Sequence, residues 1–225
     1  MASKIISFIL QPFAKPIRYI LLKIMKKIRQ PDDERPIIAT ANHILKDIIF
    51  PYIFDIFKSD RFRELAEFKK MPTSEHDRIF NELQIAGISL VVFYLRTVEP
   101  LMGPDDYNFW RDVDDRLPRE LQKILISYGV DGANAKLMRQ LIDMRYEEYE
   151  KMKAEVLEVN DEENKNFETL SPELKRIVST VQAIAVGTAH HIKRGKIKEG
   201  DPLIKYLVGC LMFLQKQIGK FVRNL

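Results

Sequence analysis

The chain is poor in the residues on which several classes of protein depend. It has one cysteine, Cys210, so an internal disulfide framework is impossible, and this fits a reducing compartment. It has nine glycines in 225 residues, few for an all-β protein with many tight turns. It also lacks a glycine-rich phosphate loop. These absences exclude a disulfide scaffold and a P-loop nucleotide-binding protein.

Long hydrophobic runs are also missing. The best candidate for a membrane span, residues 5–22, is interrupted by Gln11, Lys15, Arg18 and two prolines, whereas a span needs ~20 mainly apolar residues. The apolar run 203–214 has only 12 residues. The N-terminus makes a poor secretory signal, because its apolar core is short and no small-residue cleavage site follows. We therefore expect no spanning helix, and a mitochondrial presequence remains an alternative interpretation of this end.

Acidic side chains are absent from the first 31 residues, which is the most informative feature of the chain. Most of the other side chains there are Ile, Leu, Phe and Met. A basic, apolar end predicts binding to an anionic membrane surface. The seven basic residues of this stretch, which we take as candidate lipid-binding residues, are Lys4, Lys15, Arg18, Lys23, Lys26, Lys27 and Arg29.

Charge is unevenly distributed over the rest of the chain. Residues 32–192 carry 21 basic and 30 acidic side chains, whereas residues 193–225 carry eight basic and two acidic ones. Both ends are therefore basic and the middle is acidic. Nucleic acid could bind such ends, but bulky aliphatic side chains, and not small polar residues or stacking aromatics, separate the cations. The pattern favours lipid and disfavours nucleic acid.

Helix start and stop signals recur along the chain and predict an all-α fold, a bundle of about eight to nine helices without a confident β-strand. Residues 85–95 are rich in branched apolar side chains, so a buried strand is an alternative there. We choose a helix because no second strand of matching strength could pair with it. Pro51 predicts a kink or a break in an apolar helix over 37–58, and Pro118 predicts two short helices in place of one.

The chain divides into a basic amphipathic N-terminal segment, residues 1–30, and a single helical domain, residues 31–225. Within the domain we expect a long helix over 133–159 whose inward face consists of Leu137, Leu141, Met144, Met152 and Val156. The stretch 155–168 has six acids, one lysine and no periodicity, which predicts an acidic loop near 158–168.

The N-terminal segment contains a predicted helix over 17–29, after Pro12 and Pro16. Lys23, Lys26 and Lys27 are expected on the face opposite its apolar stripe. Ile24 is the central residue of that stripe and joins the candidate lipid-binding residues. The apolar stripe consists of Ile17, Ile20, Leu21, Ile24 and Ile28.

Residues that could support catalysis or hold a metal are few. No histidine follows an acid by three or four residues, so the Glu-x-x-His pattern of bundle metal sites is absent, and we predict neither a metal nor a cofactor. His43 and Asp47 are four residues apart and could point the same way on a helix, which makes them weak catalytic candidates. The alternative is a locally satisfied pair at the boundary of the core.

Three carboxylates, Asp143, Glu147 and Glu150, share one face of the long helix predicted over 133–159. A solvated face is the default interpretation. A docking site for a basic segment is the second, and a divalent metal site ranks last because no other helix offers a matching acidic face. We keep the three residues as candidate interaction residues.

Together these features predict a cytoplasmic, peripheral membrane-associated scaffold or regulatory module that binds anionic lipid through its N-terminal segment. Enzymatic activity ranks lower, because no nucleophile and base have a defensible spacing. One alternative is a helical-bundle enzyme or binding protein for an apolar small molecule, with Asn42, His43, Asp47 and Arg96 as its polar groups. Another is an assembly subunit, or a homo-oligomer, whose apolar ends pack on a protein partner.

Overall fold

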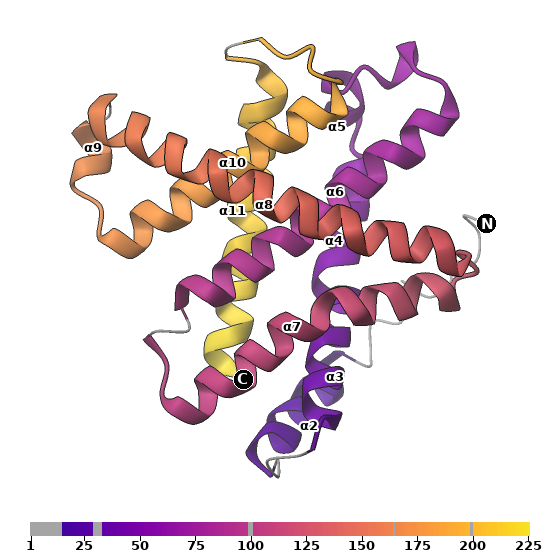
Figure 1. Ribbon diagram of the computed structural model, residues 1–225, viewed down its shortest axis with the longest axis vertical. Helices are drawn as coiled ribbons and strands as arrows, with labels where there is room; N and C mark the ends of the chain where they lie inside the picture. Colours follow the sequence, from indigo (N-terminus) through magenta and orange to yellow (C-terminus); the bar gives the residue numbers. More distant parts are fainter. Residues whose placement is uncertain (1–14, 29–32, 99–100, 164, 199) are drawn as a thin grey trace.

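The protein is a bundle of helices (Figure 1). The computed structural model describes residues 15–28, 33–98, 101–163, 165–198 and 200–225. No strand occurs in these ranges, so the all-α prediction is confirmed, and residues 85–95 are helical.

The helices differ widely in length, and several of them are joined by only one or two residues. In chain order they are α2 (Lys15–Lys27), α3 (Arg35–His43), η1 (Ile44–Ile49), α4 (Phe50–Lys58), α5 (Asp60–Leu65), η2 (Phe68–Lys70), α6 (Thr73–Val98), α7 (Pro104–Ser127), α8 (Gly132–Glu163), α9 (Lys165–Glu168), α10 (Pro172–Ile192) and α11 (Pro202–Asn224).

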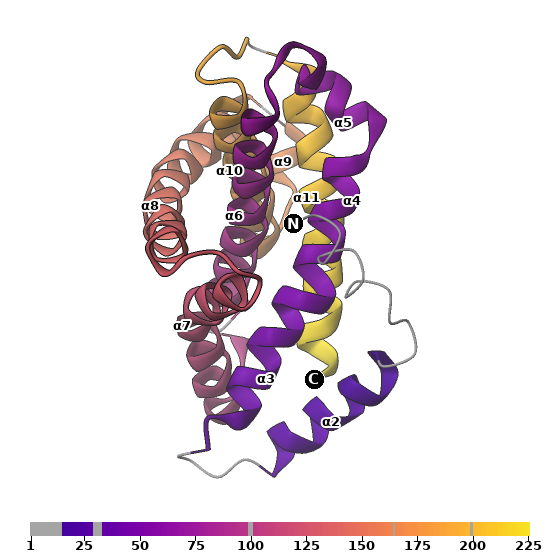
Figure 2. The same ribbon diagram turned by 90° about the vertical axis from the view of Figure 1, so that its right-hand side faces the viewer.

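Helices α6 and α10 form the centre of the bundle. They contact each other and lie between α8 on one side and α4 and α11 on the other (Figure 2). Every residue from Glu82 to Leu95 of α6 is buried, as its nearly continuous apolar sequence requires. Gly187 of α10 allows α8 to cross closely, because a Cβ there would lie 2.5 Å from the ring of Tyr149. Gly187 therefore marks the point where α8 crosses α10.

Helices α3, η1 and α4 follow one another without a break and form a single rod, Arg35–Lys58. The break considered at Pro51 does not occur. The residues before it form η1, a wide π-helical turn, in which the N–H of Phe50 donates to the carbonyl of Leu45. A wider turn accommodates a proline ring that lacks an N–H donor and would crowd the carbonyl four residues before it. Over η1 each N–H donates to the carbonyl five residues before it instead of four, and the helix then continues as α4.

The prediction that Pro118 divides its segment into two helices is wrong. Helix α7 runs from Pro104 to Ser127 with Pro118 inside it. Proline removes one backbone hydrogen bond, but burial on both sides of it holds the helix together, since Trp110, Leu117 and Leu121 are almost completely buried.

The acidic loop expected near 158–168 is replaced by helix: α8 continues to Glu163, and α9 occupies Lys165–Glu168. Glutamate is a good helix former, so a run rich in glutamate is compatible with a helix. Two contacts fasten this end of the molecule. The Asn160 side chain donates to Gln182 of α10 at 2.6 Å, and Phe167 is buried.

The inward face predicted for α8 is correct at Leu141 and Met152, which are partly buried against the core, and wrong at two other positions. Leu137 and Met144 are 54% and 58% exposed, whereas Met138, Ile142 and Tyr149 are buried. The sequence offers two apolar series, one residue apart, that both satisfy helical spacing. The large Tyr149 ring, packed where α10 has its glycine, decides between them.

Side chains that precede a proline cap the starts of α10 and α11. The hydroxyl of Ser171 accepts from the N–H of Leu174 at the start of α10. At the start of α11, buried Asp201 accepts from the N–H of Leu203 at 2.9 Å and from Lys193 at 2.7 Å. Burial acts to raise the pKa of Asp201, but these bonds outweigh it and hold the pKa below its ordinary value.

Candidate functional site

Helix α2 packs on the bundle through one narrow face. Leu22 is 2% exposed and belongs to the core. The Tyr19 hydroxyl donates to the backbone carbonyl of Asn224 at 2.7 Å, which ties α2 to the end of α11. Lys26 forms a 2.9 Å ion pair with Asp106 at the start of α7. These residues are three or four apart, so they share one side of the helix.

The opposite face of α2 is apolar and turned away from the bundle. Its residues lie at about 100° per residue around the helix, on the side opposite Leu22. Lys23 and Lys27 are exposed and flank this face. We call it the α2 stripe, and its described members are Ile20 (57% exposed), Leu21 (52%), Ile24 (49%) and Ile28 (70%).

Lys26 has a different environment from the neighbouring lysines. Its side chain is only 17% exposed, and its ammonium lies 5.1 Å from the ring centre of Phe109 and 5.4 Å from that of Trp110. The positive charge of Lys26 is therefore paired with groups of α7, through the ion pair with Asp106 and these cation–π contacts. Among the basic residues selected from the sequence, Lys26 therefore attaches α2 to the bundle, while Lys23 and Lys27 face solvent.

The other four basic candidates for lipid binding fall outside the part of the chain that the structure describes in full. Lys4 and Arg29 lie outside the described residues, as do the side chains of Lys15 and Arg18. Leu101, three residues before α7, is a further exposed aliphatic side chain, at 67%.

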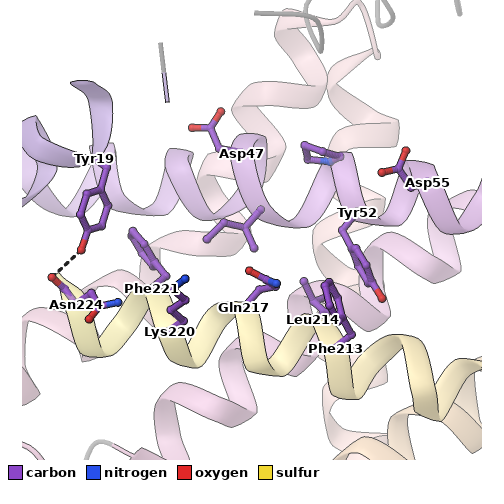
Figure 3. A pocket seen from close by; sticks show the side chains of 12 residues that line it. Tyr19, Asp47, Tyr52, Asp55, Phe213, Leu214, Gln217, Lys220, Phe221 and Asn224 are labelled. Carbon is purple, nitrogen blue, oxygen red and sulfur yellow. Dashed lines mark hydrogen bonds between the residues drawn. The ribbon is translucent and has the colours of Figure 1, made fainter. Parts of the chain in front are cut away.

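His43 and Asp47 do converge, with 2.8 Å between Nδ1 of His43 and Oδ2 of Asp47. His43 is 7% exposed, and its ring lies 4.9 Å from that of Phe221. Asp47 lines an open groove of about 520 Å³ between the rod and α11, and Figure 3 shows its carboxylate pointing away from α11, as does that of Asp55. The pair therefore lies within the rod at the edge of the groove, and only the His43 ring contacts α11.

The polar groups of the alternative small-molecule site do not come together. Asn42 donates to Glu120 of α7 at 3.2 Å, and Arg96 pairs with Asp114 at 2.8 Å, away from the groove. In the described part of the chain, no group of three or more His, Cys, Asp or Glu side chains could hold a metal ion.

The three acids of α8 separate into two environments. Glu150 accepts from the Tyr146 hydroxyl and pairs with Lys153, so it is engaged locally. Asp143 and Glu147 instead line a cleft of about 670 Å³ between α6, α7 and α8.

The cleft also contains a buried acid that was not among the candidates from the sequence, Asp114. A signal for it exists: Trp110, Asp114, Leu117 and Leu121 follow helical spacing, so an acid stands on the apolar face of α7. Asp114 is 5% exposed, and burial raises its pKa above the ordinary value despite the bond from Arg96.

Two helices, Arg35–Lys58 and Thr73–Val98, have the length and apolar composition of a membrane span, whereas the sequence led us to expect none. Thr73–Val98 is the central helix, and 83% of its most apolar window is buried by the protein itself. For Arg35–Lys58 the buried share is 44%.

No protein-family model, curated protein or solved structure matches this chain.

Proposed function

We propose that this protein is a peripheral membrane module, in which the α2 stripe inserts shallowly into an anionic bilayer and the surrounding cations bind lipid headgroups. The outward face of α2 carries this proposal. It keeps four large aliphatic side chains in water, although Leu22 on the same helix is packed in the core. Interfacial helices combine an apolar face with flanking Lys or Arg in this way.

The energies favour binding that is firm but reversible. Full burial of an Ile or Leu side chain contributes roughly 1.5–3 kcal/mol, and the four members of the stripe each have about half of their surface left to bury. The apolar term is therefore roughly 3–6 kcal/mol. Each cation near an anionic surface adds about 1 kcal/mol, so Lys23 and Lys27 alone contribute about 2 kcal/mol.

The flanking charges favour lipid over a protein partner or a second copy of the chain. A homodimer through the α2 stripe would bring the lysines of both copies together, and like charges at close range oppose association. An anionic bilayer offers the complementary charge and an apolar layer at once. We infer a cytoplasmic location, where anionic lipid faces the protein.

The test is flotation of the intact protein with vesicles of phosphatidylcholine, with and without phosphatidylserine. We expect binding to the anionic vesicles that weakens as salt is raised, and little binding to neutral ones. Equal binding to both compositions, or none to either, contradicts the proposal. A dimer in solution that Ile24→Asp dissociates would assign the stripe to a second copy.

Point substitutions test this better than deletion of residues 1–30. Leu22 is part of the core, so a deletion would open the bundle and confuse loss of binding with loss of fold.

A further inference from the structure

The cleft between α6, α7 and α8 has the size of a small-molecule site. Its volume is about 670 Å³, within the usual range for ligand pockets. Val92 and Ile142, both almost fully buried, give it an apolar floor. Nothing in the proposed membrane surface on α2 uses this cleft.

Two residues that line the cleft each have a buried side-chain oxygen without a hydrogen-bond partner. Asp114 uses Oδ2 to accept from Nε of Arg96 at 2.8 Å, but its Oδ1 has no partner, and neither has Oγ of Ser89. Both residues are more than nine-tenths buried. An unsatisfied buried acceptor is unfavourable, and more so when it is charged, so these atoms favour a ligand that supplies donors.

The backbone of α7 reinforces this excess of acceptors. Pro118 lines the cleft and has no N–H, so it cannot donate to the carbonyl of Asp114 as another residue would. Arg96 does not donate to Oδ1 of Asp114 as well. Its guanidinium lies over the ring of Tyr146, 4.4 Å from the ring centre.

The rim of the cleft has one more negative than positive side chain. Asp115, Asp143 and Glu147 stand with Arg119 and Arg139, and in the part of the chain that the structure describes none of the five forms an ion pair within 4.0 Å. Together with the neutral Arg96–Asp114 pair at the bottom, they leave a net negative site. A cation is therefore the complementary ligand.

We propose that this cleft binds a small organic cation, a guanidinium or primary ammonium group on a short carbon chain. The cationic group donates N–H bonds to Oδ1 of Asp114 and Oγ of Ser89, and the carbon chain lies on Val92 and Ile142. The rim carboxylates hold a second cationic group at the other end of the ligand.

The experiment is isothermal titration of the intact protein with agmatine, which carries a guanidinium and an ammonium on a four-carbon chain. Succinate, a short dianion, is the matched control of opposite charge. We expect one agmatine per chain and no heat from succinate. Binding of succinate alone, or no saturable binding of agmatine up to about 10 mM, overturns the assignment.

Two substitutions locate the site. Asp114→Asn keeps the shape but removes the charge, and should weaken agmatine binding at least about tenfold, the worth of a hydrogen bond to a charged group. Ser89→Ala removes one acceptor from a buried helical position without strain and should weaken it roughly threefold to tenfold. Ser89→Ala also serves if Asp114→Asn does not fold.

The control is Asp55→Asn, which removes one carboxylate from the other groove and should leave agmatine affinity unchanged. Agmatine affinity unchanged in Ser89→Ala and in a folded Asp114→Asn would place the ligand elsewhere and refute the proposal. Because α2 takes no part in the cleft, failure here leaves the membrane proposal intact, and the converse also holds.

Discussion

Substitution of Ile24 by aspartate is the sharpest perturbation of the proposed membrane surface. Ile24 is central in the α2 stripe, between Ile20 and Ile28 one turn away on either side. It is 49% exposed, so its replacement leaves the packing of Leu22 on the core untouched. The fold should survive while the outward face changes from apolar to anionic.

The expected loss follows from two terms. The exposed half of an isoleucine contributes roughly 0.7–1.5 kcal/mol when it enters the bilayer. An added carboxylate near an anionic surface costs about 1 kcal/mol by the same electrostatics that favours a lysine there. The sum is about 2 kcal/mol, or roughly 30-fold in the partition coefficient.

The assay is vesicle flotation with phosphatidylserine, with Leu137→Asp as the matched control. Leu137 is 54% exposed on α8, so the control makes the same chemical change and the same change in net charge at a comparably exposed site. We expect Leu137→Asp to bind like the unaltered protein. Circular dichroism melting of both variants checks that they fold.

Two results would refute the reasoning. Undiminished binding of Ile24→Asp would remove α2 from the membrane contact. An equal loss in Leu137→Asp would show that net charge alone governs binding, without an oriented face.

Three further outcomes are expected. Replacing Lys23 and Lys27 together with Gln should cost about 2 kcal/mol of binding to anionic vesicles at low salt and flatten the salt dependence measured by flotation. Gly187→Ala should destabilise the fold by about 1–3 kcal/mol in urea, because its Cβ would meet the buried tyrosine ring of α8, whereas Gly209→Ala, with nothing within 4 Å, should not. The lowered pKa of Asp201 stabilises the fold above about pH 4 and ceases to do so as pH falls through that lowered pKa, so Asp201→Asn should lower stability at neutral pH and make it less sensitive to acid in chemical denaturation.

The helices with local start and end signals were predictable, and those governed by packing were not. Ser171 and Asp201 predict the starts of α10 and α11, because a capping side chain accepts a hydrogen bond from a backbone N–H in the first turn of the same helix. Pro118 was misleading, since the cost of one lost backbone bond is local but the burial of Trp110 that outweighs it depends on other helices.

The candidate sites follow the same division. The basic, acid-free end and the spacing of the α2 stripe can be predicted from the sequence, because charge and helical periodicity are properties of neighbouring residues. Asp114 stood on an apolar helix face, but its pairing with Arg96, 18 residues away, needed coordinates.

By itself, then, the sequence determined the helical class, the positions of the caps, the charge of each segment and the existence of an apolar stripe on α2. Only the tertiary structure decided that this stripe faces outward, that Lys26 turns to Asp106, and that α8 buries Tyr149 and exposes Met144. The physical reason is that secondary structure is selected by hydrogen bonds and propensities over a few residues. Which face of a helix is buried depends on the surface offered by distant helices, and several helices of this chain have two faces able to compete for it.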